Sequence, residues 1–349
     1  MLVIVLRVVR RERTLGLLVS HSEDSMKNCP VLTLGASLSL AAAAFAYPVH
    51  AQPFPAKPIH VLIGSAPGGV LDIVTRQLAE RLEAQTGQRV IVEAKASAGG
   101  IVALEALKNS APDGYTIATV PMSQMSVSPS LFRSLPYDPL KDFAPVGILF
   151  RGPQLLVVNA SVPAVTLKEL TSLSLGRPEG IRYSSPANGS PSHVIMEEVR
   201  FQTGANLQHI PYRGPNANIA VVSGEVDALL EGVAPMLPLI QADKVRALAV
   251  TGNRRVAVLP DVPTFAELGI KDIDAVWVGV IAPRGTPQPV IEFLNAQFAR
   301  AVRSPELLRA YEKLGRVVAP GSPREMAATI ESEIPRWREV VRRAGIVAN

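Results

Sequence analysis

The chain has 349 residues, of which 48% are hydrophobic and 19% are charged, a composition typical of a globular protein rather than a disordered one. Its formal net charge of +5 falls to +3 once residues 1–51 are left out, because they hold five basic and three acidic residues. A charge this small and this dispersed gives no reason to expect a nucleic-acid-binding surface.

The N-terminal segment is typical of a targeting sequence. Residues 31–47 are small and apolar, follow a lysine, and precede a cleavage site of the A-x-A type before Gln52. We therefore expect residues 26–51 to be a cleavable signal peptide and residues 1–25 to be an upstream extension. An uncleaved membrane anchor is the alternative, although the run is rich in Ala and Ser and barely long enough to span a bilayer. Since Cys29 lies inside this segment, the mature chain would contain no disulfide or cysteine metal site.

A glycine-rich turn, residues 64–72, follows the first predicted strand, residues 59–63. Apolar residues at four-residue spacing come next and predict a helix. The adjacent Gly68 and Gly69 let a ligand approach the main chain, and the start of a helix carries positive partial charge, so the turn suits a small anion such as a carboxylate. Alternatively the glycines only shape the connection, since neither a Walker A motif nor a dinucleotide fingerprint is present.

The next part of the chain repeats this arrangement. A strand at 90–93 leads through a second glycine-rich turn to a helix at 101–107, and another strand is predicted at 115–120. This alternation predicts an α/β fold with a mostly parallel sheet. Because ligands of such sheets bind beyond the carboxyl ends of the strands, we expect the two turns and Ser123 to meet at one edge.

A second α/β series begins at a strand covering 155–158. The strand at 181–185 runs into a serine-rich loop, and Ser192 is the expected N-cap of a helix at 193–202. The loop offers hydroxyl donors to an anion, or it is an ordinary serine-rich turn. Further strands are predicted at 207–210, 226–231, 245–250 and 277–281, and helices at 289–303, 306–314 and 324–344.

Eight motifs occur in order along residues 54–347. They are Pro67-Gly68-Gly69 with Asp72 and Arg76, then 92–100, 112–116, 135–143, 183–185, 210–214, 259–264 and 337–345. Together they resemble the Bug (TctC-like) family of periplasmic substrate-binding receptors of tripartite tricarboxylate transporters.

This resemblance implies a type II periplasmic-binding fold, in which two α/β lobes with mostly parallel sheets are joined by crossing strands. Lobe 1 would comprise 52–152 and 276–349, and lobe 2 would comprise 153–275. The protein would capture a small carboxylate between the lobes in the periplasm and present it to a membrane permease, without catalysis, cofactor or metal. The implied ligand contacts are Ser65, Gly68, Gly69, Val70, Ser97, Gly99, Gly100 and Ser123 in lobe 1, and Ser184, Ser185, Asn188, Ser190, Tyr212 and Arg213 in lobe 2.

The sequence departs from the family pattern at the expected pocket. Val70 and Leu71 stand where a third glycine and a threonine are common, and Ala94 and Ile101 stand where asparagines are usual. These changes remove polar groups from the pocket rim. We therefore hypothesise a ligand less polar than a short dicarboxylate, such as an aromatic or branched monocarboxylate, because unmatched polar groups on a ligand would stay unsatisfied.

Other functions are less well supported by the residues. Neither Ser190 nor Ser192 lies in a G-x-S-x-G motif of the kind that presents a nucleophilic serine. Adjacent residues such as Ser192 and His193 seldom form a nucleophile–base pair, so no catalytic residue is expected. The histidines of the mature chain lack metal-ligand spacing. Arg213 is either a ligand contact or a solvated loop arginine. A second function class, a secreted sensor that docks onto the ectodomain of a membrane kinase, stays open beside transport.

Overall fold

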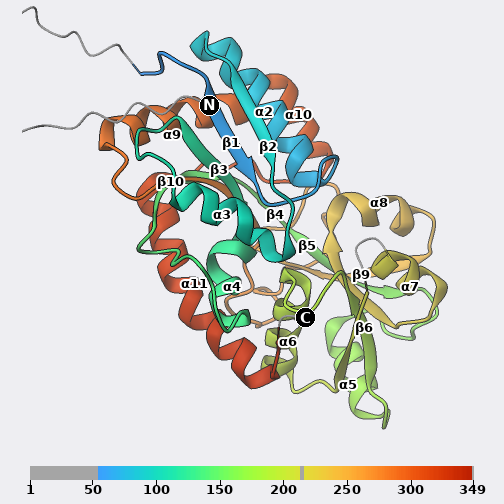
Figure 1. Cartoon of the computed structure of the whole chain (residues 1–349). Coiled ribbons are helices and arrows are strands. Elements are labelled where there is room, and N and C mark those ends of the chain that lie inside the picture. Colours follow the sequence, from blue (N-terminus) through green and yellow to red (C-terminus); the bar gives the residue numbers. More distant parts are fainter. Residues whose placement is uncertain (1–53, 213–215, 348–349) are drawn as a thin grey trace, which may run out of the picture. The chain divides into compact units, whose positions relative to one another are not determined.

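The strands of the chain form two five-stranded sheets. A computed structural model of the chain describes residues 54–212 and 216–347 (Figure 1). The first sheet has the order β2-β1-β3-β10-β4 and the second has the order β7-β6-β8-β5-β9. The first consists of β1 (Ile59–Ile63), β2 (Val90–Ala94), β3 (Thr116–Pro121), β4 (Phe143–Gly152) and β10 (Val276–Pro283). The second consists of β5 (Gln154–Asn159), β6 (Ile181–Ser185), β7 (Leu207–Pro211), β8 (Ala228–Gly232) and β9 (Val245–Val250).

One strand in each sheet runs against the other four. β10 pairs antiparallel with β3 and β4, and β5 pairs antiparallel with β8 and β9. The pairs β1–β2, β1–β3, β6–β7 and β6–β8 are parallel. The chain passes between the sheets at these reversed strands, because β5 follows β4 after Pro153 alone and β10 follows β9. The prediction of mostly parallel sheets joined by crossing strands is confirmed.

Helices pack on both sheets. Those in the part of the chain that builds the first sheet are α2 (Val70–Thr86), α3 (Ile101–Lys108), α4 (Ser128–Leu131), α9 (Gln288–Val302), α10 (Pro305–Lys313) and α11 (Pro323–Ala344). Those within the second part are α5 (Leu167–Leu175), α6 (Pro191–Thr203), α7 (Asn216–Ser223) and α8 (Val233–Gln241). None of the helices among the described residues combines the length and apolar character needed to cross a bilayer.

α2 shows how the sequence produces a covering helix. Val74, Leu78 and Leu82 lie at four-residue spacing and are all buried against the first sheet. The helix ends at Gly87, which has a φ of +69° and donates its N–H to Glu83 O. Because only glycine adopts this left-handed conformation at little cost, the residue stops the helix where the sequence predicts.

α11 connects elements of both sheets. A capping box of Ser322 and Glu325 opens it, and Gly345 in the left-handed conformation ends it. Its buried face, which includes Trp337, packs on β4 and α4 and also reaches α6 (Figure 1). The long C-terminal helix therefore supports the first sheet and contacts the second part of the chain.

The structure differs from the sequence prediction in two segments. α6 begins at Pro191 with Ser190 as its N-cap, rather than after Ser192, because proline fits the first helical turn and Ser190 Oγ accepts the His193 N–H. The prolines in residues 135–143 favour a surface passage, but Tyr137 and Phe143 are buried.

Some predictions concern residues outside the described ranges, and one concerns the boundaries of the lobes. The extension at 1–25, the signal peptide at 26–51 and Arg213 lie outside the described residues. The division into lobes at 152/153 and 275/276 remains a prediction.

Candidate functional site

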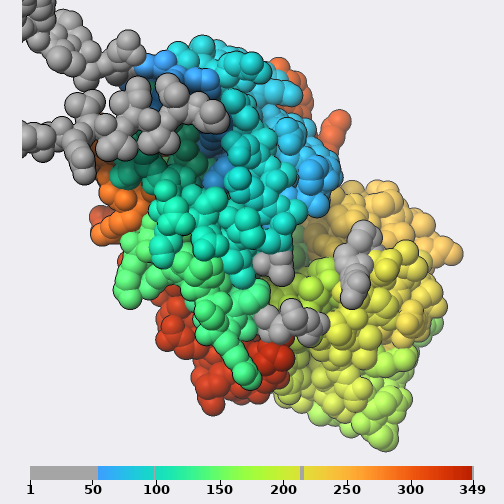
Figure 2. Space-filling model, in the orientation of Figure 1, coloured from blue at the N-terminus to red at the C-terminus, as the bar shows by residue number. Residues whose placement is uncertain are grey.

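A polar pocket of about 420 Å³ lies where loops after β1, β2, β3 and β6 meet. It is lined by Gly64, Ser97, Gly99, Gly100, Ser123, Gln124, Ser128, Leu131, Phe132, Ala187, Asn188, Gly189, Ser190 and Pro191. We call this set the polar pocket. The loops follow the carboxyl ends of parallel strands, which is where α/β sheets bind ligands. In Figure 2 the teal surface near residue 100 lies next to the yellow-green surface near residue 200.

Close packing of two glycines around one amide forms the floor of the polar pocket. A Cβ on Gly64 would lie 2.5 Å from Gly100 Cα, and a Cβ on Gly100 would overlap the Gln124 side-chain amide. Gly100 also has a φ of +71°, which disfavours any other residue. The buried Tyr137 donates its hydroxyl to the backbone carbonyl of Gln124 at 2.7 Å, which holds the main chain at this residue. Gln124 Oε1 is buried without a hydrogen-bond partner among the described residues.

A glycine-rich turn at the start of a helix is expected to present free N–H groups, but three glycine amides in these turns already donate hydrogen bonds within the chain. Gly68 N–H donates to Asp72 Oδ2 at 2.8 Å, and Gly69 N–H donates to Ala66 O at 3.2 Å. Likewise, Gly100 N–H donates to Ser97 O at 3.0 Å. The Arg76 guanidinium and the Gly68 N–H hold the pKa of the Asp72 carboxyl below its usual range. Asp72 thus holds the turn through Gly68 and also places a negative charge in the first turn of α2.

The opposite wall of the polar pocket rests on the buried His193 and the half-buried His209. The rings of His193 and His209 stack with centroids 3.5 Å apart. Gly189 N–H donates to His193 Nδ1 at 3.1 Å, and His209 Nε2 lies 2.6 Å from Ser185 Oγ. Burial lowers the pKa of His193 to about 4 and that of His209 to about 3. Both rings are therefore neutral near pH 7, as the Gly189 hydrogen bond requires.

The fold brings together part of the predicted site. Ser97, Gly99, Gly100, Ser123, Asn188 and Ser190 line the polar pocket. Ser65, Gly68 and Gly69 belong to the turn after β1 but do not line it, and Val70 lines a neighbouring groove. Ser184 and Ser185 are buried and donate to Ala217 O and Ala187 O. Tyr212 donates its N–H to Ser185 O. Ligand contact by any of these residues stays a prediction.

Sequence reasoning missed Gln124, Ser128 and the histidine pair. Gln124 could have been noticed as an amide between two apolar methionines in the run after β3. The histidines lie sixteen positions apart, and the packing of α6, which carries His193, against β7, which carries His209, brings them together. No local sequence signal predicts that contact.

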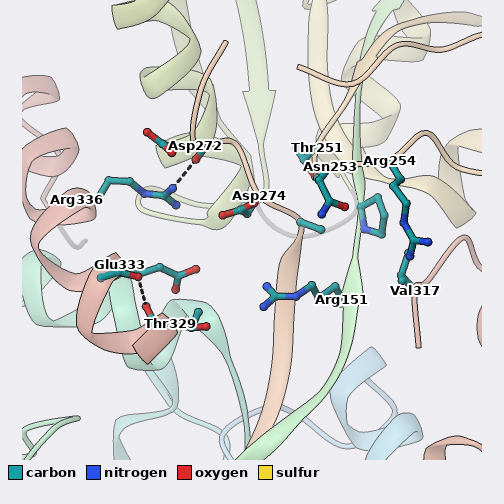
Figure 3. Close-up of a pocket in the computed structure, with 14 residues that line it drawn as sticks. Arg151, Thr251, Asn253, Arg254, Asp272, Asp274, Val317, Thr329, Glu333 and Arg336 are labelled. Carbon is teal, nitrogen blue, oxygen red and sulfur yellow. Dashed lines mark hydrogen bonds between the residues drawn. The ribbon is translucent and has the colours of Figure 1, made fainter. Parts of the chain in front are cut away.

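A second cavity, of about 490 Å³, lies where β4 and α11 meet the segments after β9 and before β10 (Figure 3). Its lining includes Arg151, Arg254, Arg336, Asp272, Asp274 and Glu333, and we call it the charged cavity. Arg151, Asp274 and Glu333 point toward its interior. No group of residues in the described part of the chain has the composition and proximity to hold a metal ion.

Glu333 links the charged cavity to the polar pocket. Its buried carboxylate accepts from Ser126 Oγ at 2.6 Å and from Trp277 Nε1 at 3.0 Å. Ser126 belongs to the π-helical turn Ser123–Val127, which also supplies Ser123 and Gln124 to the polar pocket. Burial raises the pKa of Glu333. This carboxyl therefore acts as an internal support for the turn.

The chemistry of the polar pocket is that of an uncharged binding site. None of its described lining residues carries a charge, while serine hydroxyls and the amides of Gln124 and Asn188 supply hydrogen-bonding groups. Such groups can bind an anion without an ion pair, and each hydrogen bond to an ionised ligand is stronger than one to a neutral group.

The chain is similar to known sequences over most of its length. A sequence model of a family described as "Tripartite tricarboxylate transporter family receptor", TctC, matches residues 74–346. The protein BugT of Bordetella pertussis is 35% identical over 309 residues, which are 88% of this chain and 95% of that protein.

Solved structures give the same picture. MatC from Rhodopseudomonas palustris, solved with bound malate, has a TM-score of 0.69 and 30% identity and covers 82% of this chain and 100% of its own. A protein from R. palustris solved with adipate has a TM-score of 0.72 and 30% identity, covering 85% and 100% of the two chains. Periplasmic binding protein BugD has a TM-score of 0.70 and 30% identity, with the same coverage. The predicted periplasmic-binding fold is confirmed.

Proposed function

The chain belongs to the TctC family of tripartite tricarboxylate transporter receptors, and we propose that it captures a small carboxylate in the polar pocket and presents it to a membrane permease. The family consists of binding receptors, so the prediction that the chain is not an enzyme is confirmed. The proposed place of capture is the periplasm, after removal of a signal peptide.

The observation that carries this proposal is the convergence of neutral hydrogen-bonding groups from both sheets on one pocket. Gln124 and Ser123 stand on one side, and Asn188 and Ser190 on the other. A carboxylate held between them would connect the two sides, and the partly enclosed setting would strengthen each hydrogen bond. Two similar proteins carry carboxylates of this size, malate and adipate, in their structures.

A thermal-shift screen of residues 52–349 tests the proposal. Malate, adipate, acidic amino acids, benzoate and branched monocarboxylates are the probes. A bound acid should raise the melting temperature by roughly several degrees at saturation. A selective response to diacids alone would contradict the hypothesis of a less polar ligand, and no response to any acid would contradict carboxylate capture itself.

A matched pair of variants assigns the response to the polar pocket. Gln124→Leu removes the buried amide, whereas Gln241→Leu changes an exposed glutamine at the end of α8. We expect the thermal shift to disappear in the first variant and to persist in the second. Equal shifts in both would place binding elsewhere.

The transport role has its own test. Uptake of the labelled acid should depend on the chain in cells that contain the permease genes. If the chain instead changes the activity of a membrane kinase without affecting uptake, the alternative of a secreted sensor is correct.

A further inference from the structure

An apolar groove of about 540 Å³ lies between α2, α8 and α10. Its apolar character comes largely from Val70, Ile73, Phe150, Val233, Val278 and Leu314. We call this set the apolar groove. Its volume falls within the range of ordinary small-molecule sites, about 300–1,000 Å³.

The walls of the groove expose large aliphatic side chains. Val70 is 67% exposed, Ile73 is 50% exposed and Leu314 is 40% exposed. Single exposed aliphatic residues are ordinary, but these three all line one groove, from the start of α2 and the end of α10. Gly315 packs closely against Val233 of α8, because a Cβ there would lie 2.7 Å from Val233 Cβ. The groove is therefore bounded by elements from both parts of the chain.

An arginine without an ion-pair partner lies in this apolar setting. The guanidinium of Arg316 lines the groove and packs over the rings of Phe150 and Tyr311, with its Cζ 5.0 Å and 5.3 Å from their centroids. Its Nη1 is buried and has no hydrogen-bond partner, and no described carboxylate lies within ion-pair distance. Burying an unpaired charge is costly, so an anionic ligand would relieve that cost.

Two further polar atoms of lining residues lack partners. Tyr311 Oη and Gln154 Oε1 are both buried and make no hydrogen bond within the described chain. Glu231, also in the lining, accepts the Gly232 N–H, and burial raises the pKa of its carboxyl. Polar groups of this kind in an otherwise apolar groove fix the orientation of a ligand.

We propose that the apolar groove is a second ligand-binding pocket, which takes a carboxylic acid with a compact aromatic or branched aliphatic body and pairs its carboxylate with Arg316. The apolar body fills the space between Val70, Ile73 and Leu314. This site is distinct from the polar pocket. Its affinity for a ligand depends on the apolar surface that the ligand buries as well as on the ligand's negative charge.

Isothermal titration of the whole chain with benzoate and with 3-methylbutanoate tests the proposal. The unmodified protein should bind at least one of these probes. Arg316→Gln should weaken that binding by roughly 10-fold or more, because a charge-assisted hydrogen bond is lost. Arg309→Gln, at an exposed position on α10, is the control and should leave the affinity unchanged. Circular dichroism confirms that each variant is folded.

A second pair of variants tests the apolar wall. Ile73→Gln should weaken binding of the same probe by roughly fivefold through lost apolar contact. Ile219→Gln changes an isoleucine that is 65% exposed on α7 and should have no effect. Equal effects of the two substitutions would contradict the proposal.

Gln124→Leu separates this proposal from that for the polar pocket. Probe binding that survives Gln124→Leu and fails in Arg316→Gln supports the second pocket. The reverse result places the probe in the polar pocket and overturns the second pocket while the proposed function stands. Absence of binding by both probes also overturns it, whereas malate and adipate test the polar pocket independently.

Discussion

The polar pocket and the charged cavity differ in the charge of the residues that line them. The polar pocket has no charged residue among its described lining and depends on small residues packed around Gln124. The charged cavity is lined by three arginines and three acidic residues, yet its clearest role is to hold Glu333 against Ser126 and Trp277. In this fold the carboxylate of Glu333 stabilises internal packing, whereas close packing of small residues and uncharged hydrogen-bonding groups form the proposed binding site.

The largest expected effect comes from filling the floor of the polar pocket. Gly100→Ala places a Cβ against the Gln124 amide at a positive φ, and we expect it to lower the free energy of unfolding by about 3 kcal/mol and to abolish acid binding. Gly68→Ala is the matched control, because its φ of +78° is similar but no atom lies within 4 Å of the added Cβ. It should cost about 1 kcal/mol.

Urea unfolding measures both glycine variants. If Gly100→Ala and Gly68→Ala cost the same, backbone conformation alone explains the glycine requirement, and the floor of the pocket is not shape-determined. Partial recovery in the double variant Gly100→Ala, Gln124→Ala would instead identify the overlap with Gln124 as the cause.

Acidification should change the contributions of the two regions to the free energy of unfolding in opposite directions. His193 and His209 have depressed pKa values, so they stabilise the folded state above pH 6.5, and this contribution is lost as the pH falls toward 4 and 3. The loss should be on the order of 2–3 kcal/mol for His193. Glu333 has a raised pKa, so its contribution grows as the pH falls toward 4.5.

Melting temperatures between pH 7 and pH 4 test this difference in sign. His209→Gln should flatten the fall of stability on acidification, whereas Glu333→Gln should steepen it. Parallel pH profiles for the unmodified protein and His209→Gln would show that the histidine pair does not titrate in this range.

Substitution of Glu333, which connects the charged cavity to the polar pocket, should have an intermediate effect on the free energy of unfolding. Glu333→Ala leaves Ser126 and Trp277 without an acceptor, and we expect a loss of about 2 kcal/mol, against about 1 kcal/mol for Glu333→Gln. Acid binding should weaken in both variants, because Ser126 and Gln124 share one turn. Unchanged affinity in a destabilised Glu333→Ala variant would show that the two regions are independent.

The smallest effect is expected at the rim of the charged cavity. Arg254→Gln changes an exposed residue, so it should alter the free energy of unfolding by less than about 0.5 kcal/mol. Titration with malate or adipate should give an unchanged affinity. A loss of binding here would mean that the charged cavity, and not the polar pocket, receives the carboxylate.

Much of the fold was predictable because local signals agree with the final structure. The strands 181–185 and 245–250 occur where the apolar pattern predicts them, and Gly87 and Gly345 end their helices. The start of α6 was misplaced because two serines compete as caps and Pro191 decides between them. The reversed direction of β10 arises from pairing with strands more than a hundred residues earlier, which no local pattern encodes.

The polar pocket was predictable only as far as its loops. The positions of glycines and serines after strands predicted that Gly100, Ser123 and Ser190 line the pocket. The place of Gln124 in the lining depends instead on how β3 and the π-helical turn pack. Hydrogen bonds within the turn, such as that between Gly68 and Asp72, also depend on geometry that composition does not reveal.

The placement of β10 also fixes an order of events during folding. β10 (Val276–Pro283) lies between β3 and β4, so the first sheet cannot be completed until the chain has been made beyond that strand. The strands of the second sheet are contiguous between residues 154 and 250 and can pair earlier. Because long-range pairings are slow to form, the part of the protein that begins the chain is expected to finish folding last.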